Sequence, residues 1–263
     1  PEGDFVSSKG KVKFTKTNGE AAGQVGEIEY DYLVNATGPK LRFDLTPGLG
    51  PDHGGNSLSV CTYEHADATA KELKRIIEVL KSGHRQTLIV GMGHGSCTCE
   101  GAAFEYVFNV DFELREAGVR DKADLIYLTN EHELGDFGVG GMTFAKGDQR
   151  LSSEVWMTQL FKEHEIIVID KAHVTEVGKN VVHYEQIDGT KGSRDFDFAM
   201  LLPPFRGADM KAFDKSGADI TSRMFAPSGF MKVDANYEQK PFEQWTAEDW
   251  PVTYECPAFP NVF

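Results

Sequence analysis

Residues 87–129 have the pattern of a strand, a glycine-rich turn, a helix and a second strand. The first part, 87–90 (TLIV), is wholly apolar, as strands buried in a parallel sheet are. The turn at 91–95 (GMGHG) precedes residues 100–117, whose apolar side chains recur at helical spacing. A second apolar run, 123–129 (ADLIYLT), follows this helix. The order predicts a βαβ unit, and therefore an α/β fold with a Rossmann-like parallel sheet.

The rest of the chain adds elements around this unit. Residues 65–82 and 151–163 have apolar side chains at helical spacing and predict amphipathic helices. Residues 11–15 and 27–34 predict strands. Four further β-rich runs predict a β-meander that returns to the sheet: 165–170, 173–177, 180–186 and 195–202. Residues 240–260 are rich in Pro and contain two Trp, and they predict an irregular excursion.

Length and charge limit what the chain can do. Its 263 residues suffice for one large domain or two ordinary ones. With 27 basic and 41 acidic residues the net charge is −14, so we expect no nucleic-acid partner. No apolar run reaches the roughly 18 residues of a membrane span, and no signal peptide is visible. The chain begins at Pro1 and ends on 260–263, which resemble the entry to a strand, so we expect an internal fragment of a longer protein.

The four cysteines are Cys61, Cys97, Cys99 and Cys256. They are too few for a disulfide scaffold. A zinc ion held by His94, Cys97 and Cys99 would lack a fourth ligand, so we expect no metal site. The thiols are therefore either buried small hydrophobic groups or redox-active groups. Cys99 directly precedes the predicted helix at 100–117, where the helix dipole would stabilise a thiolate.

The glycine-rich turn fits a nucleotide fingerprint only in part. The G-x-G-x-x-G pattern begins at Gly91, but Ser96 stands in the place of its third glycine. The acidic residue that would bind the ribose is expected about 20 residues further on. The candidate here, Glu131, comes later than that. The turn therefore favours a Rossmann-type core whose nucleotide function is lost or replaced.

Several segments resemble the sulfide:quinone oxidoreductase family. Residues 30–39 (YDYLVNATGP) are similar to the segment by which flavoproteins with two dinucleotide-binding domains pass close to FAD. Residues 99–106 (CEGAAFEY) are more specific, since they resemble the run whose cysteine faces the flavin in this family. Further similar segments are 59–66, 134–138, 203–207 and 229–234.

The resemblance implies a FAD-dependent oxidoreductase that oxidises sulfide through cysteines beside the flavin and passes the electrons to a quinone. It implies a partial FAD-binding domain at 1–45, a connection and helix at 46–87, a Rossmann-like second domain at 88–204 and a truncated return to the FAD domain at 205–263. It implies a cytoplasmic or peripheral membrane protein, with membrane contact through regions outside this chain. A homo-oligomer is compatible with the sequence.

Three departures from the family pattern keep other functions open. The N-terminal glycine fingerprint for FAD and the A-x-G-D segment that should follow Phe263 are both absent. The position of the family's second redox cysteine is Asn236, and the remaining late cysteine is Cys256. The alternatives are a related flavoprotein with another donor, NADH or a thiol, and an excised domain that is inactive alone.

The resemblance also implies roles for single residues. Cys99 would be the redox thiol and Cys256 its partner, unless either is an inert thiol. Glu105 would move protons if it is buried, and would otherwise be a structural carboxylate. His65 and His94 could move protons too, or be capping and surface residues. The residues implied at the cofactors are Cys61 beside the flavin, Thr37, Gly38 and Pro39 along FAD, and Phe205 beside the quinone ring. Cys97 has no family counterpart and is best interpreted as a bystander.

Overall fold

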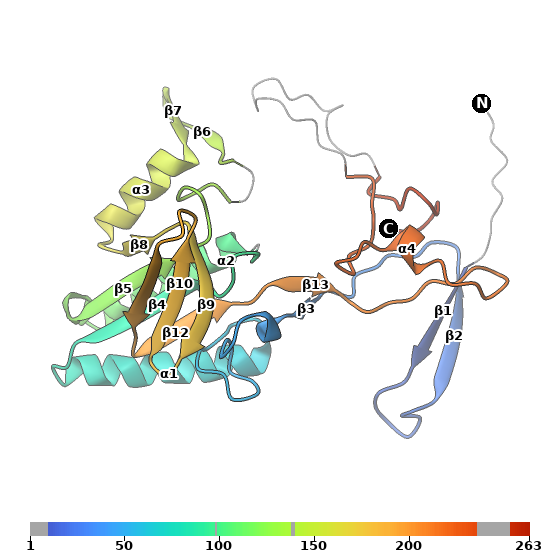
Figure 1. Cartoon of the computed structure of the whole chain (residues 1–263), viewed down its shortest axis with the longest axis horizontal. Helices are drawn as coiled ribbons and strands as arrows, with labels where there is room; N and C mark the ends of the chain where they lie inside the picture. The colour runs from blue at the N-terminus through green and yellow to red at the C-terminus, as the bar shows by residue number, and fades with distance from the viewer. Residues whose placement is uncertain (1–9, 98, 138–139, 236–252) are drawn as a thin grey trace. The chain divides into compact units, whose positions relative to one another are not determined.

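The computed structural model describes residues 10–97, 99–137, 140–235 and 253–263. The chain divides into two compact units. The central unit is Lys40–Phe205, and the split unit combines Pro1–Pro39 with Arg206–Phe263. Each unit is described separately below, and Figure 1 labels their helices and strands.

A four-stranded parallel sheet forms the middle of the central unit (Figure 1). Its strand order is β12 (Phe198–Leu202), β4 (Gln86–Met92), β5 (Ala123–Leu128) and β8 (Ile167–Ile169). All three pairings are parallel, and β4 and β5 are apolar and buried along most of their length. The predicted α/β fold with a parallel sheet is confirmed.

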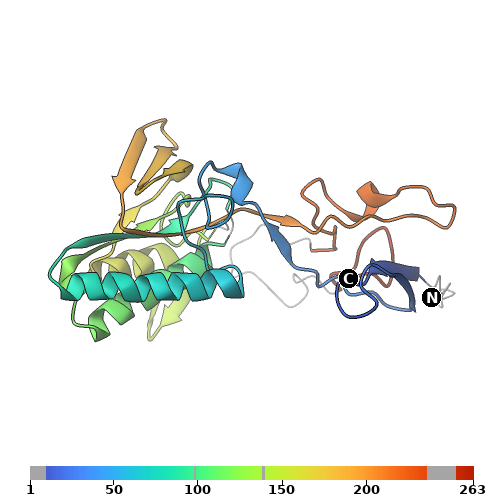
Figure 2. The ribbon, with the colours of Figure 1, turned by 90° about the horizontal axis from the view of Figure 1, so that it is seen from below.

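Three helices cover one face of this sheet: α1 (Tyr63–Lys81), α2 (Glu100–Glu116) and α3 (Ser153–Glu163). Figure 2 shows them on one side of the sheet and the later strands on the other. In α2 the buried stripe includes Ala103, Val107, Val110 and Leu114, which pack against β4 and β5. Burying such a stripe is the main source of stability for a helix of this length.

The opposite face is covered by a three-stranded antiparallel meander, β9 (Ala172–Gly178), β10 (Val181–Gln186) and β11 (Lys191–Asp195). The sequence predicted that the meander returns to the sheet. Instead β9–β11 form their own sheet, and only the flanking strands β8 and β12 join the parallel one. Leu49, from the loop before α1, is buried in the same apolar layer as the meander.

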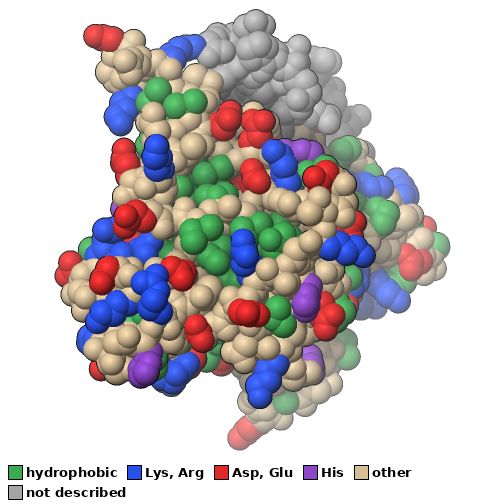
Figure 3. All heavy atoms as spheres, turned by 60° about the vertical axis from the view of Figure 1, so that its left-hand side comes forward, with side chains coloured by type: hydrophobic (Ala, Val, Ile, Leu, Met, Phe, Trp, Pro, Cys, Tyr) green, Lys and Arg blue, Asp and Glu red, His purple; other side chains and the backbone are tan. Residues whose placement is uncertain are grey.

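Shorter elements complete the central unit. A β-hairpin, β6 (Thr143–Lys146) and β7 (Gln149–Ser152), lies directly before α3 and was not predicted. Two single turns of 3-10 helix are η1 (Phe43–Leu45) and η2 (Arg120–Lys122). The face of the molecule in Figure 3 shows basic and acidic side chains interspersed around a patch of hydrophobic ones.

The split unit contains the antiparallel hairpin β1 (Gly10–Thr15) and β2 (Val25–Tyr30) and the short helix α4 (Thr221–Met224). Leu33 forms a parallel bridge with Val262, and the N–H of Asn35 donates to the carbonyl of Phe263. The C-terminal residues thus pair as a strand does, as the sequence predicted. The chain passes between the units at β3 (Pro39–Leu41) and β13 (Phe205–Gly207). Asn236 and both Trp of the predicted excursion lie outside the described residues.

Candidate functional site

Cys99 is the residue at which α2 begins. Its carbonyl accepts hydrogen bonds from the backbone N–H groups of Ala102 (3.1 Å) and Ala103 (3.4 Å), which belong to the first helical turn. The helix starts here because the segment after Cys99 (EGAAF) has a carboxylate in the first turn and two alanines, which are strong helix formers. The sequence-based placement of Cys99 at a helix N-terminus is therefore correct.

The position of Cys99 does not make its thiol acidic. Burial raises the pKa of the Cys99 thiol, a backbone hydrogen bond from Ala102 acts in the opposite direction, and the charge of Glu100 raises the pKa further. The expected stabilisation of the thiolate by the helix dipole is outweighed, because the free-energy penalty of removing a thiolate from water is larger than the stabilisation by the helix N-terminus. Cys99 is a half-buried free thiol.

Cys61 lies close to Cys99, although 38 positions separate them in the sequence. It precedes Thr62, the residue that caps α1 by accepting a hydrogen bond from the N–H of His65 (3.2 Å). Burial raises the pKa of Cys61, a hydrogen bond with Ser59 lowers it, and the charge of Cys99 raises it. Both thiols pack against the same apolar core, so two cysteines implied by the family resemblance share one place in the central unit.

Cys97 is the most buried thiol of this region, with 1% of its surface exposed. Its Sγ donates to the carbonyl of Pro203 (3.2 Å) and, at longer range, to that of Leu202 (3.5 Å). A thiol with carbonyl acceptors and no access to water behaves as a small packed group. This placement agrees with its interpretation as a bystander.

The acidic residue beside the thiols is Glu100, which the sequence analysis missed. Glu105, the predicted proton carrier, is exposed on the outer side of α2, so the burial that its role required is absent. Glu100 is 8% exposed and continues the buried stripe of α2 by one turn. Burial raises the pKa of Glu100, and the charges of Glu131 and Asp136 raise it further. Counting back three residues from Ala103 would have identified it.

Four of the predicted residues belong to the split unit. Thr37, Gly38 and Pro39 are exposed, and the Thr37 hydroxyl donates to Oδ1 of Asn35 (2.8 Å). Gly38 has φ +71°, and a Cβ there would meet nothing within 4 Å. Cys256 is 1% exposed, and its N–H donates to the carbonyl of Val262 (2.7 Å). All four cysteines lie in the described part of the chain, and no disulfide joins any of them.

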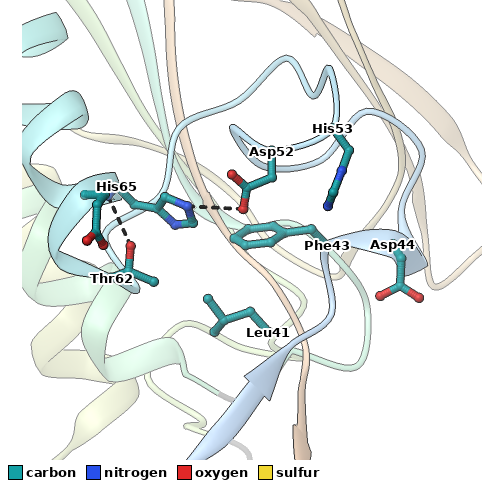
Figure 4. A pocket seen from close by; sticks show the side chains of 8 residues that line it. Leu41, Phe43, Asp44, Asp52, His53, Thr62 and His65 are labelled. Atoms are coloured by element: carbon teal, nitrogen blue, oxygen red, sulfur yellow. Dashed lines mark hydrogen bonds and ion pairs between the residues drawn. The ribbon is translucent and has the colours of Figure 1, made fainter. Parts of the chain in front are cut away.

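A cavity of about 500 Å³ lies beside the N-terminus of α1. Figure 4 shows His65, Asp52 and Phe43 gathered on one side of it. Nε2 of His65 is 3.2 Å from Oδ2 of Asp52, and the Phe43 ring meets the imidazole edge-on at 5.7 Å. Nδ1 of His65 is buried and has no hydrogen-bond partner among the described residues. Thr62 lines the cavity, and the preceding residue in the chain is Cys61.

Phe205 is half-buried at the start of β13, in the central unit. Within the described ranges, no group of three or more His, Cys, Asp or Glu side chains is arranged to hold a metal ion. No helix of the described part is long and apolar enough to cross a bilayer.

Comparison with known proteins identifies relatives of the chain. No protein-family model matches the sequence. The sulfide-quinone reductase of Aquifex aeolicus (strain VF5) is 32% identical over 209 residues, which are 80% of this chain and 44% of that protein. The chain is related to the sulfide:quinone oxidoreductases. The mitochondrial sulfide:quinone oxidoreductase of Dictyostelium discoideum is 34% identical over 100 residues, 38% of this chain and 21% of that protein.

The fold leads to the same family. The solved structure of the Aquifex aeolicus sulfide:quinone oxidoreductase matches 90% of this chain with a TM-score of 0.66 and 29% identity. The chain covers 46% of that structure, so it spans less than half the length of the relatives it matches. The resemblance seen in the sequence is confirmed, and the chain has the fold of a flavoprotein oxidoreductase.

Proposed function

We propose that the protein takes electrons from sulfide through the Cys99 thiol, with FAD as cofactor and a quinone as acceptor. The observation that carries the proposal is the placement of Cys99 at the N-terminus of α2, half-buried and beside both Cys61 and the buried Glu100. The relatives named for sulfide and quinone support this choice of donor and acceptor.

Sulfide enters by thiol–disulfide exchange in this proposal. When Cys99 and Cys256 are joined as a disulfide, HS⁻ attacks one sulfur, a new S–S bond forms to sulfide, and the other cysteine leaves as a thiolate. The electron pair of the broken bond stays on that thiolate, and the attacked cysteine carries a persulfide. Cys256 is the proposed partner because the family's expected cysteine position is Asn236 in this chain.

Glu100 is the proposed proton carrier beside Cys99. Its raised pKa lets a carboxyl group hold a proton at a pH where an ordinary glutamate is ionised. In its protonated form Glu100 can give a proton to the leaving cysteine thiolate, and in its ionised form it can accept the proton that the persulfide loses. The His65–Asp52 pair is the second candidate, since its imidazole lies next to the segment that carries Cys61.

The residues of the split unit fit contact with FAD. Gly38 leaves open space where a side chain would stand, and Thr37 offers an exposed hydroxyl. We propose that Thr37, Gly38, Pro39 and Cys61 would contact FAD and that Phe205 would contact the quinone. When bound, FAD would supply the acceptor for the electron pair of the cysteine thiolate. Contact with a membrane that holds the quinone is proposed for segments outside this chain.

The test is an anaerobic titration of the full-length protein, first with sulfide and then with NADH. We expect sulfide to bleach the flavin absorbance in wild type, and Cys99→Ser to abolish this bleaching while flavin content is unchanged. The control is Glu105→Gln, which changes an exposed carboxylate on α2 and leaves every cysteine in place. Sulfide should bleach the flavin of this variant as it does in wild type. Bleaching by NADH and not by sulfide would contradict the proposal.

A further inference from the structure

The glycine-rich turn between β4 and α2 is closed by a histidine from the meander. The N–H of Gly95 donates to Nδ1 of His173 on β9 (2.9 Å). This approach is so close that a Cβ on Gly95 would lie 2.0 Å from the same Nδ1. In nucleotide-binding folds, the N–H groups of this turn hold the pyrophosphate. Here an imidazole occupies the place of that anion.

Three further N–H groups in and directly after the turn also have acceptors within the protein. Ser96 donates from its backbone to Nδ1 of His94 (3.0 Å), and Cys97 donates to the carbonyl of His94 (3.1 Å). Gly93 donates to the carbonyl of Leu202 (2.8 Å). The rings of His94 and His173 meet edge-on with centroids 4.8 Å apart. Burial lowers the pKa of His94, and the neighbouring His173 lowers it further, so the His94 ring favours the neutral state in which its Nδ1 accepts.

Two more positions that a dinucleotide would need are occupied. A Cβ on Gly93 would come within 2.3 Å of Cδ1 of the buried Leu49, so a leucine fills the space through which a pyrophosphate would approach. The carboxylate of Glu131 accepts from the Thr129 hydroxyl (2.9 Å) and from the N–H of Phe137 (3.0 Å). Its oxygens therefore organise their own loop and are not directed at a ribose.

We propose that His173 replaces the pyrophosphate of a dinucleotide at this turn and thereby restricts the central unit to a donor other than NAD(P)H. The inference deepens the proposed function, on which it rests only for the choice of donor. The inference explains why residue 95 is a glycine. Without a side chain there, the His173 ring can approach the backbone, as a phosphate approaches the backbone of a nucleotide fingerprint. His173 is a specificity-determining residue that acts by occupying the site.

The experiment is a calorimetric titration of the 263-residue chain with inorganic pyrophosphate and with NADH. His173→Ala removes the acceptor and the volume, whereas His173→Asn keeps an oxygen near the place of Nδ1. The matched control is His183→Ala, an exposed histidine on the neighbouring strand β10. We expect His173→Ala to bind pyrophosphate at least about tenfold more tightly than wild type, about 1.4 kcal/mol. His173→Asn and His183→Ala should bind as weakly as wild type.

A second measurement follows the turn itself. The amide resonance of Gly95 should move in His173→Ala, because its N–H loses its acceptor, and should stay near its wild-type position in His173→Asn and His183→Ala. The inference is overturned if wild type binds pyrophosphate or NADH as well as His173→Ala does. It is also overturned if His173→Ala frees the Gly95 amide without any gain in binding. Neither result bears on bleaching of the flavin by sulfide, so the two proposals fail separately.

Discussion

Nε of Arg120 lies 2.6 Å from Oδ1 of Asp111, and the two side chains form a buried ion pair between η2 and the middle of α2. Arg115 and His164 also contact the Asp111 carboxylate, at 2.8 Å and 2.6 Å. Arg120 in turn donates to the carbonyls of Ala123 and Glu165. One carboxylate thus fixes the ends of α2 and α3 relative to the sheet.

Replacing Asp111 should destabilise the central unit. Asp111→Asn leaves Arg120 buried without a counter-charge, and breaking such a pair costs about 3–5 kcal/mol. The free energy of unfolding, measured by urea denaturation, should fall by an amount in this range. The control is Asp121→Asn, an exposed aspartate on η2, for which we expect no more than about 0.5 kcal/mol. Equal effects of the two substitutions would disprove the assigned role.

The same network predicts a pH dependence. Burial alone would raise the pKa of Asp111, but hydrogen bonds from Arg115, His164 and Arg120 outweigh it and lower the pKa below the ordinary 3.8. A carboxyl group whose pKa is lower in the folded state stabilises the fold when ionised. This contribution is present above about 3.8 and is lost as the pH falls through the lower, folded-state pKa. Urea denaturation of Asp111→Asn should therefore show a weaker acid dependence than wild type.

The thiol of Cys99 should react slowly at neutral pH. Its pKa is raised above 9.0 by burial and by the charge of Glu100, so alkylation by iodoacetamide should reach half its maximal rate above that pH. Glu100→Gln removes the charge and should shift the profile of Cys99 to lower pH. Glu105→Gln removes an equal charge from the exposed side of α2 and should leave it unchanged. Peptide mass spectrometry separates Cys99 from the other thiols.

Cys61 should respond to Cys99. Because the charge of Cys99 contributes to the raised pKa of Cys61, Cys99→Ser should shift the alkylation profile of Cys61 to lower pH. Cys97→Ser is the matched control, since serine can still donate to the carbonyl of Pro203. An unchanged Cys61 profile in Cys99→Ser would show that the two thiols do not interact.

Two glycines should respond in opposite directions to the same substitution. A Cβ on Gly91 would lie 1.8 Å from the carbonyl oxygen of Leu128, so Gly91→Ala should push β4 and β5 apart and cost at least about 1–3 kcal/mol. Gly101 is exposed in the first turn of α2, where a Cβ meets nothing within 4 Å. Gly101→Ala should stabilise the fold by about 0.5–1 kcal/mol. Thermal unfolding of both variants gives the comparison.

The parts of the fold that the sequence predicts are those with a long, regular apolar pattern. The spacing of Ala103, Val107, Val110 and Leu114 placed α2 within a residue of its observed end, because tertiary burial and local pattern agree there. The hairpin β6–β7 and strand β11 were missed, because segments such as 191–195 (KGSRD) have no apolar alternation. Their strands are set by pairing with neighbours, which a local pattern does not contain.

The place of Cys99 in the fold was predictable from the sequence, but the electrostatics around its thiol were less so. The motif at 99–106 placed Cys99 at a helix N-terminus correctly, but the direction of its pKa shift depends on burial by distant segments. For the same reason the sequence indicated Glu105, whereas the buried carboxylate is Glu100. The packing of α2 on the sheet decides which of the two carboxylates is desolvated. His173 was invisible in the sequence, because it reaches Gly95 from 78 positions away.

The two ends of the central unit's sequence lie next to each other, because the N–H of Arg42 donates to the carbonyl of Pro204 (2.9 Å). Its whole sequence is therefore continuous, whereas the split unit needs residues from both sides of it. During synthesis on the ribosome, the central unit can finish folding before residues 206–263 have emerged. During that time the N-terminal part of the split unit lacks its C-terminal pairing partner, because Val262 has not yet been synthesised to pair with Leu33.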